Sequence, residues 1–266
     1  MILFPPAKIN LGLNVLHKRP DGFHELETVL MQIPIHDVLE ILPSSKFSYR
    51  QSGIEFEQDV ESNLVVRAYR LLQNDFSIPE TSFHLLKNIP VGAGLGGGSA
   101  DAAYALIGLN TLYNLNISDA ELRDISGKLG SDCPFFISCQ PQIGTGRGEV
   151  MELIELDLKG YYLKLIHPGI HISTSQAYNE IEFSTIATTI NEVINEPIEN
   201  WKNLLFNSFE TAAFKKYPEL ERIKASLYSE GAVYASMTGS GSSLYGIYDK
   251  EPIVSNGNLF ERVVQL

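Results

Sequence analysis

The sequence predicts an α+β fold, and three observations lead to this class. Strand-like and helix-like segments come in mixed runs without strict alternation, which disfavours a doubly wound parallel sheet. The 266 residues are enough for about two domains. With 44% apolar and 20% charged residues, the composition is that of an ordinary globular chain. We therefore expect two packed domains, at 1–158 and 159–266.

The first half of the chain carries start and stop signals for its elements. Ser62 or Asn63 precedes a helical run of apolar residues. Ser118 and Glu121 form a capping box, and Gly130 stops the helix that they begin. The expected elements are strands at 38–42, 47–50 and 83–86, and helices near 64–72, from about 99 and from 118.

The second half begins with a strand at 161–167, which Pro168 and Gly169 close. Pro218 suits the first turn of a helix that Gly231 ends. Two strands follow at 232–236 and 244–249, around a loop of sequence Thr-Gly-Ser-Gly-Ser.

Charge and cysteine content exclude several classes of protein. The chain has 20 Lys and Arg against 32 Asp and Glu, so a general nucleic-acid binder, which needs a basic face, is not expected. Cys133 and Cys139 match no zinc or redox spacing, and so few cysteines fit a cytosolic chain with reduced thiols. We expect no signal peptide, because two prolines break the first apolar run, and no membrane span. The expected location is cytoplasmic.

A glycine-rich loop is the most informative segment. It has five glycines within the seven positions 92–98 and leads directly into the helix expected from about Ser99. Glycines let a ligand approach the backbone, and a helix N-terminus offers unpaired N–H groups with a partial positive charge. A linker or a tight packing turn is the alternative, but a linker would not continue into an amphipathic helix. The predicted polyphosphate site consists of Pro90, Val91, Gly92, Ala93, Gly94, Leu95, Gly96, Gly97, Gly98, Ser99 and Ala100.

Two common nucleotide motifs do not explain this loop. The run Gly92-x-Gly94-x-x-Gly97 satisfies the dinucleotide fingerprint, but Pro90 breaks the junction between strand and turn, and no clear acidic residue ends a second parallel strand. A P-loop does not fit either, because the only Gly-Lys pair, at 127–128, is followed by leucine.

The loop instead resembles that of the GHMP kinase superfamily, Pro-x-x-x-Gly-Leu-Gly-(small)-Ser, from Pro90 to Ser99. Two more segments resemble that superfamily in the same order, Pro-Ala-Lys-Ile-Asn-Leu-Gly-Leu at 6–13 and Met-Thr-Gly-Ser-Gly-Ser-Ser at 237–243. The resemblance implies the two-domain GHMP kinase fold. Its N-terminal domain, similar to domain 2 of ribosomal protein S5, binds ATP and is catalytic, and its ferredoxin-like C-terminal domain contributes to the substrate site.

Other segments resemble the GHMP kinases that act on CDP-methylerythritol. They are Arg-Pro-Asp-Gly-Phe-His at 19–24, the extended glycine run at 94–103, Leu-Gly-Ser-Asp-Cys-Pro-Phe-Phe at 129–136, and His-Pro-Gly at 167–169. The resemblance implies an ATP-dependent kinase of the non-mevalonate isoprenoid pathway that phosphorylates the 2-hydroxyl of its substrate. Mg²⁺ should accompany ATP, with Ser99 as a hydroxyl near it and no carboxylate ligand assigned.

Lys8 and Asp132 are the predicted catalytic residues. Strand alternation places Lys8 and Asn10 on one face, although a strand lysine with its ammonium in solvent is the alternative. From local sequence, Asp132 is a helix N-cap before Pro134 or a general base, with the cap favoured. The resemblance favours the base. It also implies that Lys8 lies beside Asp132, where it keeps the carboxylate ionised and stabilises charge on the transferred group.

The resemblance also assigns the substrate side. Phe23 would stack on cytosine and His24 would bond its polar edge, but a loop aromatic that covers the core explains Phe23 equally well. Tyr178 is a second stacking aromatic or an ordinary helix tyrosine. The loop with Thr238 and Gly239 lines the phosphate site or is only a tight hairpin. The predicted substrate-binding set is Asn10, Phe23, His24, Tyr178, Thr238 and Gly239.

Other functions stay open at this point. A GHMP kinase for homoserine or mevalonate shares the loop, but the Asp-Gly-Phe-His run at 21–24 argues against it. A catalytically silent nucleotide-binding regulator is disfavoured by intact Lys8 and Asp132, and a dehydrogenase is remote. The expected partners are ATP and CDP-methylerythritol, with no nucleic acid and no membrane. The expected state is a monomer or a homodimer.

Overall fold

The computed structural model describes residues 1–54, 59–181, 183, 188–254 and 259–266. It divides into two compact units, each built from several stretches of chain. Unit 1 comprises 1–7, 35–91 and 96–139, and unit 2 comprises 8–34, 92–95 and 140–266. These units follow packing rather than chain order, so the single boundary at 158/159 stays a prediction. Among the residues described, no helix is long and apolar enough to cross a membrane.

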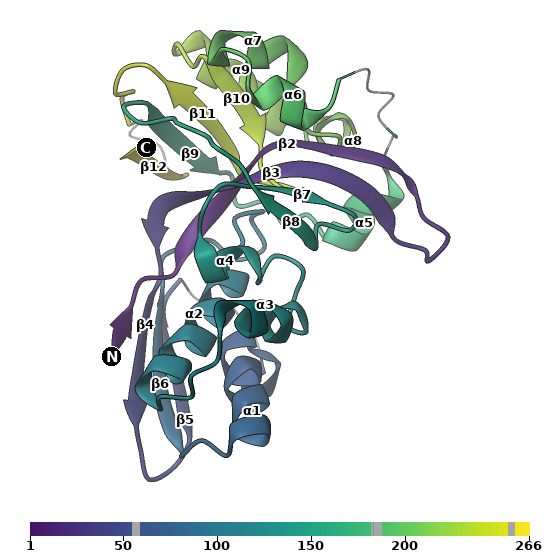
Figure 1. Ribbon diagram of the computed structural model, residues 1–266. Coiled ribbons are helices and arrows are strands. Elements are labelled where there is room, and N and C mark those ends of the chain that lie inside the picture. Colours follow the sequence, from purple (N-terminus) through teal and green to yellow (C-terminus); the bar gives the residue numbers. More distant parts are fainter. Residues whose placement is uncertain (55–58, 182, 184–187, 255–258) are drawn as a thin grey trace. The chain divides into compact units, whose positions relative to one another are not determined.

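Unit 1 is a four-stranded sheet with helices packed on one of its faces (Figure 1). It contains β1 (Ile2–Leu3), β4 (Val38–Pro43), β5 (Ser48–Gly53), β6 (Thr81–Lys87), a 3-10 turn (Val60–Ser62), α1 (Leu64–Phe76), α2 (Gly97–Leu112), α3 (Asp119–Gly127) and α4 (Phe135–Ser138). The strand order is β1-β4-β6-β5, antiparallel except for the parallel β5–β6 pair. Its core joins Leu39 and Ile41 of the sheet to Leu72 of α1 and Leu106 of α2.

The predicted helix starts in unit 1 are confirmed at two positions. The side chain of Asn63 accepts a hydrogen bond from the N–H of Val65 and so caps α1. Ser118 and Glu121 form the expected capping box of α3. That helix ends at Gly127, earlier than the sequence suggested.

The start of α2 differs slightly from the expectation. The helix begins at Gly97 instead of about Ser99. Gly96 precedes it with a φ of +68°, a left-handed conformation that glycine adopts without strain. The glycine loop therefore reaches into the first turn of the helix.

Unit 2 contains two four-stranded sheets with helices beside the second (Figure 1). The first sheet has the order β2-β3-β7-β8 and the second the order β10-β11-β9-β12, which is antiparallel. Largely antiparallel sheets with helices packed beside them, in both units, confirm the α+β class. The elements are β2 (Pro6–Lys18), β3 (His24–His36), β7 (Gln142–Thr145), β8 (Val150–Leu153), β9 (Tyr162–His167), α5 (Thr174–Asn179), α6 (Ile190–Ile194), α7 (Ile198–Leu204), α8 (Glu210–Lys216), α9 (Pro218–Ser229), β10 (Tyr234–Met237), β11 (Leu244–Tyr248) and β12 (Phe260–Gln265).

The long strands β2 and β3 are the largest difference from the sequence prediction. Each has 13 residues, whereas the sequence places Lys8 and Asn10 in a strand but predicts bounds for neither strand. The first ten residues of β2 are all buried, so the strand lacks the polar–apolar alternation by which a half-buried strand is recognised. The strand expected at 161–167, the helix from Pro218 and the two strands around the 238–243 loop are confirmed as β9, α9, β10 and β11.

Candidate active site

The ammonium of Lys8 is held by two oxygens within unit 2. Lys8 and Asn10 share a face of β2, and Lys8 Nζ donates to Asn10 Oδ1 at 2.6 Å and to the carbonyl of Gly94 at 3.1 Å. The side chain of Lys8 is 4% exposed, so the alternative of a solvent-facing lysine is wrong. Ile9 and Leu11, on the opposite face, are fully buried. The alternation predicted from the sequence is therefore confirmed.

The amide of Asn10 can point in only one direction. The hydroxyl of Thr28 donates to the carbonyl of Gly12 at 2.6 Å, so it must accept from Asn10 Nδ2, at 3.0 Å. With its nitrogen toward Thr28, the amide turns its oxygen toward Lys8. The N–H of Asn10 donates to Thr238 Oγ1 at 3.1 Å, and the same hydroxyl lies 3.2 Å from Asn10 Oδ1.

The loop at 238–243 meets the centre of the first glycine loop. Thr238 Oγ1 lies 3.1 Å from the carbonyl of Gly94. Gly94 has a φ of +78°, and a Cβ there would lie 2.1 Å from the Thr238 carbonyl oxygen. The N–H of Thr238 also donates to the carbonyl of Ser243 at 3.0 Å, which closes a hairpin between β10 and β11. The segment is thus a hairpin, and it also contacts the glycine loop.

Unit 1 holds the start of α2, which is suited to an anion. Gly96 occupies the N-cap position, and glycine has no side chain with which to accept from the first-turn N–H groups. The N–H groups that follow it are therefore available to phosphate oxygens, at the positive end of a 16-residue helix. That ATP phosphates bind at this helix start stays a prediction.

Asp132 lies in a turn that packs beside the start of α2 within unit 1. The N–H of Cys133 donates to the carbonyl of Gly130 at 3.1 Å. A Cβ on Gly130 would lie 4.0 Å from Ser99 Oγ. Burial raises the pKa of the Cys133 thiol to about 11, although its hydrogen bond with Ser99 opposes the shift. Ser99 and the segment around Asp132 therefore occupy the same part of unit 1.

The helix-capping role expected from local sequence does not fall on Asp132. The N-cap of α4 is Pro134, and no side-chain hydrogen bond caps this helix among the residues described. A further turn, closed by the N–H of Phe136 and the carbonyl of Cys133, separates Asp132 from the helix. Asp132 is half-buried, and its place beside Lys8 stays a prediction.

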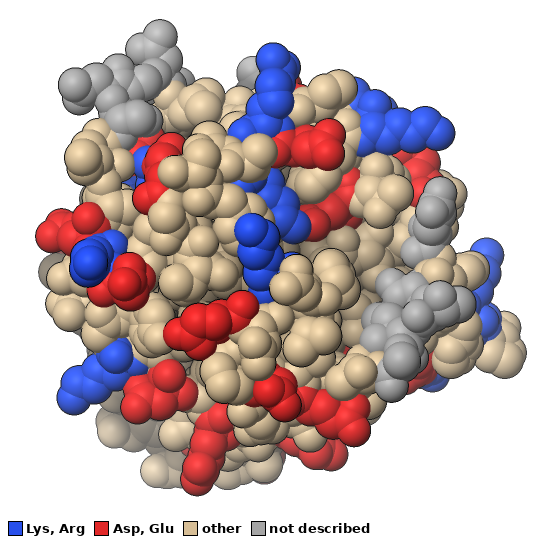
Figure 2. Space-filling view, turned by 90° about the horizontal axis from the view of Figure 1, so that it is seen from above, with Lys and Arg blue, Asp and Glu red and all other residues tan. Residues whose placement is uncertain are grey.

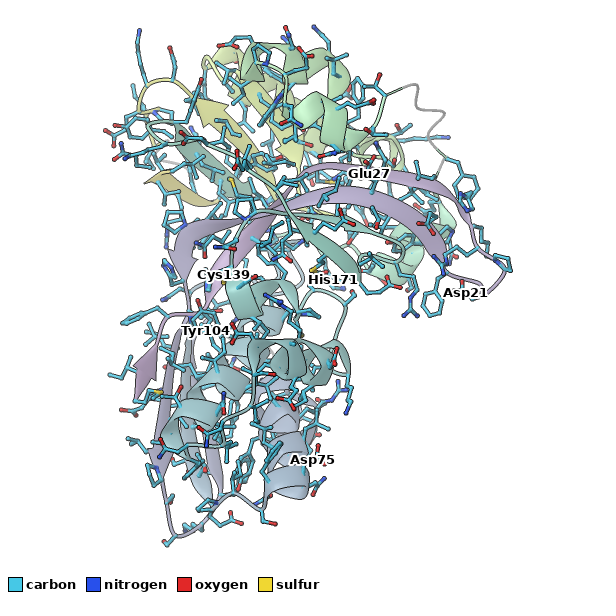
Figure 3. The ribbon with its side chains drawn as sticks, viewed as in Figure 1. Asp21, Glu27, Asp75, Tyr104, Cys139 and His171 are labelled. Carbon is cyan, nitrogen blue, oxygen red and sulfur yellow. The ribbon has the colours of Figure 1, made fainter. Side chains whose placement is uncertain are left out.

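The Arg19–His24 run forms the turn between β2 and β3. Arg19 pairs with Asp21 at 3.1 Å and with Glu25 at 2.6 Å, and the Asp21 carboxylate accepts the N–H of Phe23 at 3.1 Å. Figure 3 shows Asp21 at the tip of this hairpin. These local pairs order the backbone that presents Phe23 and His24.

Aromatic rings gather around His24. The ring of Tyr178 stacks on His24 with centroids 4.9 Å apart, and Phe183 lies at 6.0 Å in a tilted arrangement. Tyr178 also packs edge-on against buried Phe209 at 4.9 Å, so it has both a structural contact and a contact with the predicted site. Burial and the charge of Lys18 lower the pKa of His24, which favours the neutral imidazole.

Two residues of this region were not found from the sequence. Phe183 is 49% exposed beside His24, and the Arg147 guanidinium lies 4.7 Å from the ring centroid of Phe23. Phe23 itself is 53% exposed, so the alternative that it covers the core is wrong. Neither Phe183 nor Arg147 belongs to a sequence motif. The sequence around them therefore could not have indicated that they lie beside His24 and Phe23.

A buried ion cluster flanks the glycine loop in unit 1 and was also not predicted. Lys87 Nζ pairs with Asp37 and with Asp101, the latter at 2.8 Å. Asp37 also accepts the N–H groups of Asn88 and Ile89 at 2.6 and 2.9 Å. The cluster therefore joins the end of β6, which precedes the glycine loop, to the second turn of α2, which follows it.

The charges of this cluster do not balance. Burial lowers the pKa of Lys87, but the two carboxylates together outweigh it and hold that pKa above its ordinary value. Burial is the largest cause that raises the pKa of Asp101, Asp37 adds to it, and Lys87 opposes it. Asp101 Oδ1 has no hydrogen-bond partner among the described residues. With one ammonium for two carboxylates, Asp101 is the group that takes up a proton.

The site offers little to a metal ion by itself. Within the described part of the chain, no group of three or more His, Cys, Asp or Glu side chains forms a metal site. Ser99, in the first turn of α2, supplies a hydroxyl oxygen of the kind that Mg²⁺ accepts. This donor set fits an ion that is held mainly by nucleotide phosphates.

The surface carries both signs of charge. On the face seen in Figure 2, Lys and Arg side chains lie next to Asp and Glu side chains. The net charge of −12 is therefore not gathered into one acidic face there.

Both halves of the chain are similar to known proteins. Residues 63–140 match the GHMP kinases N terminal domain, and residues 190–255 match the GHMP kinases C terminal domain. A 4-diphosphocytidyl-2-C-methyl-D-erythritol kinase of Bacteroides fragilis is 48% identical over 94% of this chain and 93% of its own length. One of Thermodesulfovibrio yellowstonii is 38% identical over 92% of this chain and 88% of its own length.

Solved structures agree with these matches. The crystal structure of a 4-(cytidine 5'-diphospho)-2C-methyl-D-erythritol kinase superposes with a TM-score of 0.80 at 29% identity, and covers 93% of this chain and 90% of the other. A homoserine kinase from Cytophaga hutchinsonii, at 15% identity, covers 97% and 93% with a TM-score of 0.63 and shares the fold alone. The chain therefore belongs to the GHMP kinase family and, within it, to the 4-diphosphocytidyl-2-C-methyl-D-erythritol kinases.

Proposed function

We propose that this protein transfers the γ-phosphoryl group of ATP to the 2-hydroxyl of 4-(cytidine 5'-diphospho)-2-C-methyl-D-erythritol. The observation that carries the proposal is the network in unit 2 that joins Lys8, Asn10, Gly94 and Thr238. It brings residues of the three sequence motifs into direct contact. Relatives named for this reaction match nearly the whole chain. GHMP kinases for homoserine and mevalonate are related only by fold and are not favoured.

ATP binds with its phosphates along the Pro90–Ala100 loop. The left-handed glycines at 92, 94 and 96 expose backbone N–H groups, and the first turn of α2 adds its unpaired donors. Ser99 would supply a hydroxyl oxygen to Mg²⁺, and the ion, when bound, would neutralise charge on the phosphate oxygens.

Asp132 acts as the general base and Lys8 as the neighbouring cation. Asp132 accepts the proton of the substrate hydroxyl as its oxygen attacks the γ-phosphorus, and the bond from that phosphorus to the β–γ bridging oxygen breaks to release ADP. Lys8, whose ammonium is directed by Asn10 and Gly94, stabilises the negative charge that develops on the transferred group.

The cytidine end binds at the aromatic group near the β2–β3 turn. Phe23, with Tyr178 and Phe183 close to His24, offers rings on which a pyrimidine stacks. Neutral His24 supplies one donor and one acceptor for the polar edge of the base. A cytoplasmic location and a monomeric or homodimeric state remain predictions from the sequence.

A coupled assay of ADP release tests the proposed function. Purified protein is given ATP and Mg²⁺ with CDP-methylerythritol, CDP, mevalonate or homoserine in parallel. We expect ADP release with CDP-methylerythritol alone. Turnover with mevalonate or homoserine, and none with CDP-methylerythritol, would contradict the proposal.

A further inference from the structure

Asn207 holds the backbone on both sides of Thr238, at the start of the 238–243 loop. Its amide nitrogen donates to the carbonyl of Met237 at 2.7 Å and to that of Gly239 at 2.9 Å. Its amide oxygen accepts the N–H of Phe209 at 3.0 Å. The residue is 3% exposed, so water cannot replace these bonds without rearrangement. Both carbonyls that flank Thr238 are thus fixed by one side chain.

Glu210, the first residue of α8, binds the end of β10 through the N–H of Met237. Its Oε1 accepts the N–H of Met237 at 2.8 Å and the hydroxyl of Ser236 at 3.1 Å. Its Oε2 accepts from Lys224 of α9 at 2.6 Å. The peptide groups of Met237 are therefore bound on one side by Glu210 and on the other by Asn207.

These contacts lead directly to the predicted catalytic lysine. Thr238 follows Met237, and its hydroxyl bonds the N–H of Asn10 and lies 3.1 Å from the carbonyl of Gly94. Asn10 and Gly94 both accept hydrogen bonds from the Lys8 ammonium. Every link of this chain of contacts lies within unit 2.

We propose that Asn207 and Glu210 are positioning residues for phosphoryl transfer. They fix the backbone on both sides of Thr238, and Thr238 in turn sets the acceptors that aim Lys8. Neither residue needs to touch a substrate. For its kinetic consequences the inference rests on the proposed function, because it assumes that Lys8 acts in the transition state.

The variants Asn207→Ala, Glu210→Ala and Glu210→Gln test this role. A misplacement of about 1 Å in a catalytic group can cost on the order of a hundredfold in rate, so we expect the two alanine variants to lose about 10- to 100-fold in kcat. KM for CDP-methylerythritol should change by less than about threefold, because His24 and Tyr178 are held by other contacts. Glu210→Gln keeps an acceptor for Met237 and should restore most of kcat.

Two control variants separate positioning from general stability. Asn110 in unit 1 holds a loop in the same manner, through the N–H and the carbonyl of Ile117 at 3.1 and 2.9 Å. Asn110→Ala should lower the melting temperature and leave kcat near the wild-type value. Lys224→Met removes the ion pair of Glu210 but not the hydrogen bond from Met237 to Glu210. It too should lower the melting temperature and leave kcat near the wild-type value.

Hydrogen–deuterium exchange gives a result that does not depend on the substrate. The peptide that spans residues 236–243 should exchange faster in Asn207→Ala and Glu210→Ala than in wild type, and at the wild-type rate in Asn110→Ala. The inference is overturned by unchanged exchange in this peptide, or by folded alanine variants with wild-type kcat. Failure of the proposed function would differ, since wild-type protein would then show no turnover with CDP-methylerythritol whatever the exchange result.

Discussion

At the scale of single residues, the site depends on polar side chains whose directions are imposed by neighbours. Thr28 orients the amide of Asn10, and that amide with the carbonyl of Gly94 aims the ammonium of Lys8. Such an arrangement keeps the cation in place before any phosphate arrives, which is how a protein stabilises transition-state charge without reorganisation. The proposed phosphoryl transfer then requires a positioned substrate hydroxyl and a carboxylate that accepts its proton. Asp132 is the candidate for that carboxylate.

Asp132→Asn tests the predicted base. Loss of a positioned general base costs about 10²- to 10⁴-fold in rate, and we expect kcat to fall by this factor. Because asparagine has nearly the shape of aspartate and keeps one side-chain oxygen as an acceptor, the melting temperature should change little. Steady-state kinetics with thermal melting measures both. The control is Asp75→Asn, at an exposed position of α1 (Figure 3), which should keep full activity. A near-wild-type kcat in Asp132→Asn would show that Asp132 is not the catalytic base.

Phe23→Ala and His24→Ala test recognition of the base. Aromatic stacking on a base contributes about 1 to 3 kcal/mol, so Phe23→Ala should raise KM for the CDP substrate roughly 10- to 100-fold and leave KM for ATP almost unchanged. His24→Ala should reduce discrimination between CDP and UDP in a competition assay, because stacking tolerates any base.

The control for Phe23 is Phe76→Ala, which removes a ring of similar exposure (41%) from the end of α1. It should alter neither KM. A rise in KM for ATP in Phe23→Ala would mean that the two substrates have been assigned to the wrong parts of the protein.

At the scale of elements, the predicted site draws on strand β2, which carries Lys8 and Asn10, and on the glycine loop that leads into α2. The first glycine loop contacts the hairpin between β10 and β11, and its stems are tied together in unit 1 by the Asp37–Lys87–Asp101 cluster. The positions of its glycines are not interchangeable. Gly94 combines a positive φ with a close backbone neighbour, the carbonyl of Thr238, whereas a Cβ on Gly92 would meet only the His171 side chain.

Gly94→Ala tests the loop, with Gly127→Ala, outside the loop, as its control. At Gly94 a Cβ would lie 2.1 Å from the Thr238 carbonyl oxygen, in a left-handed backbone, whereas at Gly127 the nearest atom is Pro134 Cγ at 3.8 Å. We expect calorimetry to show ATP affinity lowered at least about tenfold in Gly94→Ala, since the loop must move. Gly127→Ala should bind ATP like wild type. Equal affinities in both variants would contradict this account of the loop.

Asp101→Asn tests the unbalanced buried cluster through the pH dependence of stability. The folded-state pKa of Asp101 lies above its unfolded value near 4, so between about pH 4 and 7 the folded state binds more protons than the unfolded state. Stability from this group therefore falls as pH rises through that window. Between pH 5 and 8, the free energy of unfolding of Asp101→Asn should exceed that of wild type by on the order of 1 kcal/mol or more. Denaturant unfolding at several pH values measures the difference, and a constant difference would contradict the assigned protonation.

At the scale of the whole molecule, the sequence predicted what depends on neighbouring residues. The capping box at Ser118, the glycine loop and the shared face of Lys8 and Asn10 are local patterns, and the structure contains them. The role of Asp132 and the pocket for cytidine came from the family resemblance. The length of β2 was missed because burial on both faces removes the alternation on which the prediction relied.

Contacts between distant parts of the chain could not be predicted. Asp37 meets Lys87 across 50 residues, and Asn207 meets Met237 across 30. Phe183 lies beside His24 although the two are far apart in the sequence. A lone Asp, Asn or Phe in a sequence gives no sign of its partner, because the partner is selected by packing and not by local conformation.

The most direct test of the central claim is to identify the bond that the enzyme makes. In CDP-methylerythritol the 2-carbon carries a methyl group and no hydrogen, so a phosphate on its oxygen has no proton three bonds from phosphorus. Proton-coupled ³¹P NMR of the reaction with ATP and Mg²⁺ should therefore show a new phosphomonoester as a singlet, with the diphosphate signals of the CDP group retained. A doublet or triplet, which would indicate transfer to another hydroxyl, or loss of the diphosphate signals, would contradict the account.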